Sequence, residues 1–236
     1  LSARAVMLVS GSLLLGYWLL MAGFGDPAQP YSLLGNAALS FDKFLMGTNH
    51  LYHGEGIPFD PEGWLSTLPA IVNVVAGYFA GKYIQQNGKG YETIAKLMLT
   101  GALAILVALC WNMAFPINKK LWTPAFVLLT SGIDLLLISA LLYIIEIKRH
   151  NDNWWTKFFV VFGKNPLFIY LLSELLVTVL YMIPVGKQPF YGWINRVLFQ
   201  VIAPGSLGSL LFALTYMLFC WSIGWWLNRK RIYIRV

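Results

Sequence analysis

Six long stretches with no charged residue, or only one, constrain the fold of this chain more than any other feature. A helix needs about 20 mostly apolar residues to cross the hydrocarbon core of a bilayer. The stretches predict membrane-spanning helices at about 5–25, 63–82, 97–115, 122–146, 166–183 and 206–228. The 236 residues are then expected to form a single transmembrane helical domain with an outer loop at 26–62.

Composition excludes an ordinary soluble domain. Charged residues make up 11% of the chain, less than half of the roughly 25% that is typical of soluble domains. Lys and Arg outnumber Asp and Glu by 17 to 10, but they lie between the apolar stretches, so we expect them to meet lipid headgroups and not nucleic acid. The stretches lack the alternation of β-barrel strands. The expected fold is an all-α integral membrane protein, a bundle of about six transmembrane helices with interfacial helices.

Basic residues are shared unequally between the two ends of the predicted spans. The end that includes Arg4 also carries Lys82, Lys89, Lys96, Lys148, Arg149, Lys157, Arg229, Lys230, Arg231 and Arg235. The opposite end carries Lys43, Lys119, Lys120, Lys187 and Arg196. The positive-inside rule therefore predicts that both termini of this chain are cytoplasmic.

The outer loop is acidic and contains two histidines. Its acidic, basic and histidine residues are Asp26, Asp42, Lys43, His50, His53, Glu55, Asp60 and Glu62. Such a loop suits a cationic, hydroxyl-rich substrate such as an amino sugar, which Asp60, Glu62 and His53 would bind. An imidazole can take a proton from an amine, so His50 is a catalytic hypothesis, with Glu62 as a second candidate. The alternative is ordinary solvated loop charge, and the spacing does not indicate a metal site.

Three polar residues fall near the middle of predicted spans: Asn73, Asp134 and Glu174. An ionisable group at this depth costs about 2.5–3.5 kcal/mol, so it should face the bundle interior, a cavity or a partner. One interpretation is a satisfied hydrogen bond between helices, with Ser131 and Ser173 as nearby partners. The other is function, either as a catalytic group, for which Glu174 is the candidate, or as a transport site.

The segment Gly163-Lys164-Asn165-Pro166 marks the start of the fifth predicted span. Asn and Pro are typical of a helix start, and the free N–H groups of that end together with the Lys164 ammonium favour an anion such as phosphate or pyrophosphate. Lys164 and Asn165 are therefore candidates for anion binding. The alternative is a lysine whose side chain extends to the membrane interface.

Five strings, in their order and spacing, together resemble the heparan-α-glucosaminide N-acetyltransferase family. They lie at residues 50–52, 60–71, 116–123, 162–166 and 170–174, and the resemblance covers nearly the whole chain. The most specific is PINKKLWT at 116–123, followed by DPEGWLSTLPAI at 60–71. Bacterial relatives are described as membrane acyltransferases or as N-acetylglucosamine-related transporters.

The resemblance implies transfer of an acetyl group from cytoplasmic acetyl-CoA to the amine of a glucosamine-type sugar on the far side of a bacterial inner membrane. Lys164 and Asn165 would meet CoA, and Asn118 and Lys119 would join the sugar site. The histidine usually assigned to transfer lies upstream, which implies that this chain is the C-terminal part of a larger multipass protein. An amino-sugar transporter, or a non-catalytic fragment of either protein, is the alternative. The sequence leaves homo-oligomer formation open.

Overall fold

The computed structural model describes residues 2–54 and 56–234. Within these residues the chain is mostly helical, and the only strands are a two-residue antiparallel pair, β1 (Pro184–Val185) and β2 (Gln188–Pro189). The predicted all-α class is confirmed. Contacts divide the chain into two compact units, Leu1–Arg149 and His150–Val236, where the sequence led us to expect one domain. Each unit is described by itself.

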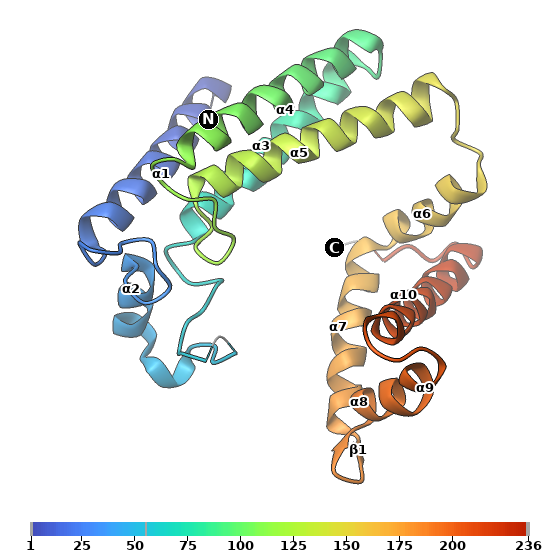
Figure 1. Ribbon diagram of the computed structural model, residues 1–236. Helices are drawn as coiled ribbons and strands as arrows, with labels where there is room; N and C mark the ends of the chain where they lie inside the picture. Colours follow the sequence, from blue (N-terminus) through green and yellow to red (C-terminus); the bar gives the residue numbers. More distant parts are fainter. Residues whose placement is uncertain (1, 55, 235–236) are drawn as a thin grey trace. The chain divides into compact units, whose positions relative to one another are not determined.

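The first unit is built on four long helices with a loop region at one end (Figure 1). Its helices are α1 (Ala3–Phe24), α2 (Ala37–Met46), the 3-10 turn η1 (Thr48–His50), α3 (Thr67–Asn87), α4 (Tyr91–Trp111), α5 (Pro124–Leu142) and the π-helical turn η2 (Tyr143–Ile147). Helices α4 and α5 pack along their length, and α3 packs against α1 and α5. A Cβ on Gly101 or on Gly132 would lie under 3 Å from the carbonyl oxygen of the other residue, so glycine permits the close approach of α4 and α5.

Aromatic and aliphatic side chains form a core at the loop end of this unit. Buried Tyr17 from α1 stacks with Phe115, and Phe115 also packs against Tyr31. Phe59 and Leu121 complete the same core from the two loops. The core thus holds the acidic loop and the 116–123 turn together at one end of the helices.

The second unit contains α6 (Trp154–Lys164), α7 (Pro166–Met182), α8 (Phe190–Ile194), the π-helical turn η3 (Asn195–Phe199), α9 (Gln200–Ile202) and α10 (Ser206–Arg229). Helices α6 and α7 bend by 78° where Asn165 separates them, because Pro166 has no N–H to continue the first helix. The Phe158 ring of α6 stacks on Trp221 of α10, and the Trp221 indole N–H donates to the Phe158 carbonyl at 3.0 Å.

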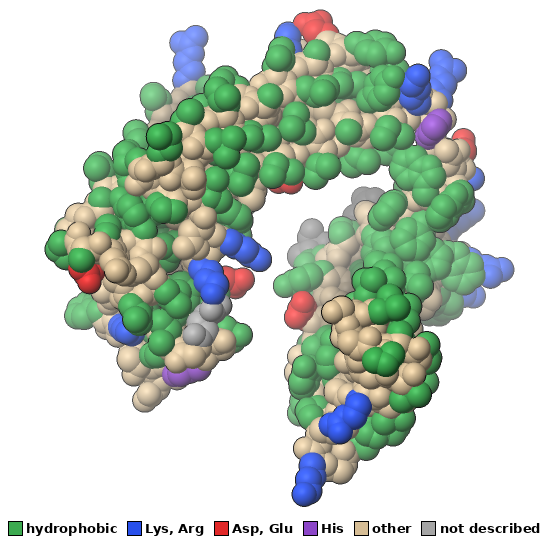
Figure 2. All heavy atoms as spheres, in the orientation of Figure 1, with side chains coloured by type: hydrophobic (Ala, Val, Ile, Leu, Met, Phe, Trp, Pro, Cys, Tyr) green, Lys and Arg blue, Asp and Glu red, His purple; other side chains and the backbone are tan. Residues whose placement is uncertain are grey.

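Four helices among the described residues are long and apolar enough to cross a membrane, or five if the bent α6–α7 pair is one span. The four are Ala3–Phe24, Tyr91–Trp111, Pro124–Ile147 and Ser206–Arg229. At most 28% of any of these apolar windows is buried within the chain, so most of their side chains face outward, as lipid-facing helices require (Figure 2). Helix α3 has 21 residues but includes Asn73, Lys82 and Gln85, and it is not among the four. Six crossings therefore stays a prediction.

Two helices begin and end away from the predicted spans. Helix α3 starts at Thr67 and not near 63, because Gly63 and Ser66 are held in a turn in which the Ser66 hydroxyl donates to the Gly63 carbonyl at 2.7 Å. Helix α4 starts at Tyr91 and not near 97, because Glu92 and Lys96 form an i,i+4 ion pair that keeps both charges in its first turns. The predicted starts at Pro166 and, after Pro204-Gly205, at Ser206 are confirmed.

Candidate functional site

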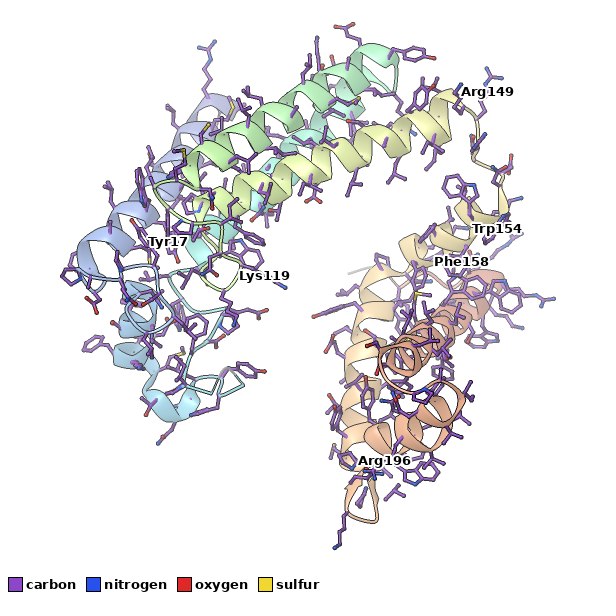
Figure 3. The ribbon with its side chains drawn as sticks, viewed as in Figure 1. Tyr17, Lys119, Arg149, Trp154, Phe158 and Arg196 are labelled. Carbon is purple, nitrogen blue, oxygen red and sulfur yellow. The ribbon has the colours of Figure 1, made fainter. Side chains whose placement is uncertain are left out.

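The 116–123 turn, which includes Lys119 (labelled in Figure 3), is held by hydrogen bonds from its own side chains. The Asn118 Oδ1 accepts the Lys120 backbone N–H at 2.9 Å, and the Thr123 hydroxyl donates to the Pro116 carbonyl at 2.8 Å. Thr123 also caps α5, with Pro124 in the first helical position. Lys119 is exposed at the tip of the turn. Asn118 thus contributes turn geometry through its amide oxygen, and Lys119 presents the free side chain.

Tyr17 anchors this turn to α1. Its hydroxyl donates to the Leu121 carbonyl at 2.6 Å across 104 residues of sequence, and its side chain is completely buried. The sequence analysis missed this residue, which lies inside an apolar stretch. The available signal was a tyrosine placed two turns before the end of a predicted span, where a buried hydroxyl needs a partner.

Asp42 organises the 60–71 string. Its carboxylate is 2% exposed and accepts the Trp64 backbone N–H at 3.1 Å. A Cβ on Gly63 would lie 1.9 Å from Asp42 Oδ2, so only glycine fits there. Burial raises the pKa of the Asp42 carboxyl above its ordinary value; the Trp64 N–H partly offsets this, and the negative charge of Asp60 adds to it. Asp42 is therefore a buried ionisable group of this end that the sequence analysis counted only as loop charge.

The predicted substrate residues of the acidic loop remain accessible. His50 is exposed, and its Nδ1 lies 2.8 Å from the Met46 carbonyl, which assigns the ring proton to Nδ1 and leaves Nε2 as the acceptor. The Asp60 Oδ1 accepts the Glu62 backbone N–H at 2.9 Å, while the Glu62 and His53 side chains are exposed. Glu55 lies outside the described residues. The described His, Cys, Asp and Glu residues include no group of three that could hold a metal ion.

Below the turn, Trp122 connects this end to the membrane interior. Trp122 has a φ of 51°, in the left-handed region that side chains other than glycine rarely adopt, and its indole N–H donates to Asn73 Oδ1 at 2.9 Å. The Asn73 amide donates in turn to the Ser131 hydroxyl at 3.1 Å and the Thr130 hydroxyl at 3.2 Å. Ser131, expected as a partner of one of the mid-span polar residues, accepts from Asn73, and both polar atoms of the Asn73 amide are hydrogen-bonded.

The other two polar residues of the predicted spans, Asp134 and Glu174, are not satisfied in this way. Asp134 is exposed and lines a groove of about 300 Å³ between α3 and α5, together with Asn73 and Ser131. Glu174 is exposed on α7 of the second unit. The Ser173 hydroxyl, the other expected partner of a mid-span polar residue, donates instead to the Tyr170 carbonyl at 2.7 Å. Local geometry decides this, because a helical serine readily bonds to a carbonyl of the preceding turn.

Lys164 and Asn165 bind the end of the chain in the second unit. The Lys164 ammonium donates to Asn228 Oδ1 at 2.9 Å and lies over the Tyr233 ring. The buried Asn165 donates to the Ile232 carbonyl at 3.1 Å and accepts the Ile234 N–H at 2.8 Å. Its side chain therefore does not cap α7, contrary to the sequence-based expectation, because the C-terminal segment occupies both of its polar atoms.

These contacts place Lys164 beside a basic segment and a cavity. Arg229, Lys230 and Arg231 directly follow Asn228, the residue that Lys164 binds. Arg235 lies outside the described residues. A cavity of about 510 Å³ within this unit is lined by Gly163 and Pro166 at the bend and by Tyr170 and Tyr216 deeper in the helices. Positive charge at the bend and an apolar, tyrosine-lined cavity beside it suit a ligand with an anionic head and a long, less polar arm.

Comparison with known proteins agrees with the motifs. Heparan-alpha-glucosaminide N-acetyltransferase of Mus musculus is 31% identical over 170 residues, which are 65% of this chain and 25% of the relative. The Homo sapiens protein of the same name is 28% identical over 168 residues, 64% of this chain and 25% of the relative. The match thus spans about a quarter of each relative's length. No model of a known protein family matches the chain. The resemblance to the heparan-α-glucosaminide N-acetyltransferase family is confirmed over about two thirds of this chain.

Proposed function

We propose that this chain is part of a membrane-bound acyltransferase that moves an acetyl group from cytoplasmic acetyl-CoA to the amine of a glucosamine-type sugar on the far side of a bacterial inner membrane. The observation that carries the proposal is the match to two proteins named as N-acetyltransferases of a glucosaminide. In this proposal both termini of the chain are cytoplasmic, and further helices encoded upstream complete the protein.

The charge distribution of the first unit supports the proposal that the sugar and acetyl-CoA approach from opposite sides of the membrane. Asp60, Glu62 and His53 lie at the loop end of the helices and would attract a sugar that carries an ammonium group. The opposite end of the same helices carries Lys82, Lys89 and Lys148. A cationic acceptor and an anionic donor would therefore approach from opposite ends.

The second unit supplies the features that an acyl-CoA needs. Lys164, Asn165 and the basic residues after Asn228 would meet the phosphates. The cavity beside the bend, with Tyr170 and Tyr216 in its lining, would take the long pantetheine arm that leads to the thioester. In this assignment the hydrogen bond to Asn228 positions the exposed Lys164 ammonium, and the ammonium also binds the phosphates.

The reaction requires a neutral amine. The amine nitrogen attacks the thioester carbonyl, a C–N bond forms, the C–S bond breaks, and the CoA thiolate leaves while a base takes the proton of the amine. The His50 Nε2 is the acceptor atom within the described acidic loop that fits this role, and Glu62 and Glu174 are the carboxylate candidates.

Sealed membrane vesicles test the proposal with the protein expressed from its native gene. Acetyl-CoA is enclosed on the cytoplasmic face and labelled glucosamine is supplied on the other face. Acetylated sugar without net uptake is the expected result. Accumulation of unmodified sugar inside the vesicles would instead indicate a transporter and overturn the proposal. Lys164→Ala should raise the KM for acetyl-CoA, whereas Lys187→Ala, at the hairpin of the same unit, should leave it unchanged.

A further inference from the structure

The groove between α3 and α5 contains an acidic side chain, that of Asp134, with no partner among the described residues. Asp134 makes no hydrogen bond and no ion pair with any residue in the described part of the chain. At 1.5 Å per residue it lies about 15 Å along the helix from Pro124, half of the roughly 30 Å hydrocarbon core. An acidic group at this depth costs about 2.5–3.5 kcal/mol unless something compensates it. A partner is therefore required.

The polar neighbours of Asp134 do not supply that partner. The Asn73 amide oxygen accepts from Trp122, and its amide N–H groups donate to Thr130 and Ser131. Ser131 accepts from Asn73, and its own hydroxyl proton has no acceptor among residues 2–54 and 56–234. The groove thus offers one carboxylate acceptor and one hydroxyl donor, on the same face of α5 and one turn apart.

The rest of the lining is small and leaves room for a ligand. Ala76, Gly77, Ala80 and Gly81 form the α3 wall. A Cβ added at Gly77 or Gly81 would meet nothing within 4 Å, so the space in front of this wall is open. A volume of about 300 Å³ lies at the lower end for ligand sites and suits one monosaccharide ring better than a whole CoA.

We infer that this groove is an intramembrane subsite for the amino group of the sugar: Asp134 binds the ammonium and the Ser131 hydroxyl donates to a ring oxygen or a neighbouring hydroxyl. The inference rests on the proposed function, and it adds to the outer-loop residues a second binding position for the ammonium, at mid-membrane depth within the first unit. A cation is favoured over a neutral or anionic occupant because the unpaired group is an acid. A second helix that covers the groove is the competing occupant.

Binding of two sugars that differ only at the nitrogen tests the inference. Affinity for glucosamine and for N-acetylglucosamine is measured on the protein from its native gene in lipid nanodiscs at about pH 6, where an alkyl amine is protonated. Asp134→Asn should weaken glucosamine binding about 10- to 100-fold and leave N-acetylglucosamine binding unchanged. Gly77→Leu should abolish binding of both sugars, because its side chain fills the groove. Ile133→Ala, an exposed residue of α5 that does not line the groove, is the matched control.

The outcomes separate this inference from the proposed function. If Asp134→Asn still transfers acetyl groups with an unchanged KM for glucosamine, the subsite proposal is refuted and the proposed acetyltransferase function stands. If glucosamine binding depends on Asp134 but the protein transfers no acetyl group, the subsite is supported and the proposed acetyltransferase function is refuted. If Asp134→Asn dissociates the protein or lowers its melting temperature in the absence of sugar, the occupant is a helix and the inference is wrong.

Discussion

The loop end of the first unit and the groove below it treat their polar groups in opposite ways. Trp122 and Asp42 at the loop end each have a hydrogen-bond partner within the chain, as does Asn73 where the groove meets that end. In the groove, Asp134 has none among the described residues. A membrane protein can satisfy a polar group within its fold or leave the group for a ligand, and α3 and α5 show both cases on one surface. Polar residues at similar depth therefore need separate functional assignments.

The largest expected effect is at Asn73. Asn73→Ala leaves the Trp122 indole N–H without an acceptor and removes the donor to Ser131, so we expect a loss of about 2–3 kcal/mol in unfolding free energy. Thermal unfolding in nanodiscs measures it. Asn87→Ala, at the exposed end of the same helix, is the control and should change the melting temperature little. Equal melting temperatures for both variants would contradict a satisfied loop end.

Gly63→Ala should have the next largest effect. The new methyl group collides with the Asp42 carboxylate, and overpacking of this kind costs about 1–3 kcal/mol. The double variant Gly63→Ala/Asp42→Ala removes the collision, so its loss of stability should be smaller than the sum of the two single losses. If the two single losses of unfolding free energy add up in the double variant, the new methyl group does not collide with the Asp42 carboxylate.

Asp134→Leu should act in the opposite direction. Removing an unpaired acid from mid-membrane depth should raise the unfolding free energy in the absence of sugar by about 1 kcal/mol, a fraction of the insertion cost of such a group. Asp134→Asn should fall between the parent protein and the leucine variant. A drop in melting temperature for both variants would mean that Asp134 has a structural partner, and the contrast between the two regions would disappear.

The smallest effect concerns pH. Because burial raises the pKa of Asp42 in the folded protein, the folded state keeps this proton to higher pH than the unfolded chain. The contribution of Asp42 to stability is therefore full below its unfolded pKa and is lost as pH rises through the raised folded pKa. Asp42→Asn keeps an oxygen for the Trp64 N–H and should remove this part of the pH dependence. The difference between the two unfolding profiles measures it, and parallel profiles would refute it.

The sequence predicted the fold class and some helix starts, because these depend on local composition and on proline and glycine. The apolar stretches gave the all-α membrane class, and Pro166 and Pro204-Gly205 fixed two helix starts because proline and glycine restrict the backbone locally. It misplaced the starts of α3 and α4, since the turn at Gly63 and the Glu92–Lys96 pair depend on side-chain contacts. The bend between α6 and α7 was also not foreseen.

The candidate site was predictable only as a set of residue types. Ser131 was anticipated as a partner for one of the three mid-span polar residues, because polar groups at this depth need hydrogen bonds, and the structure pairs it with Asn73. Tyr17 and Trp122 were missed, since their roles come from contacts across 104 and 49 residues of sequence. Asn165 has the expected N-cap position of α7, but its side chain makes no capping bond because its partners, Ile232 and Ile234, lie far along the chain.

Sidedness of the two ends is the most direct test of the central claim, that the acidic, histidine-bearing end and the basic end face opposite sides of the membrane. Single cysteines replace His53, Lys187, Gln86 and Lys230 in a background in which Cys110 and Cys220 are alanine, and intact cells are treated with a membrane-impermeant maleimide. The account predicts that cysteines at positions 53 and 187 react in intact cells and that those at 86 and 230 react only after permeabilisation. Reaction at 53 and 86 from the same side would contradict it.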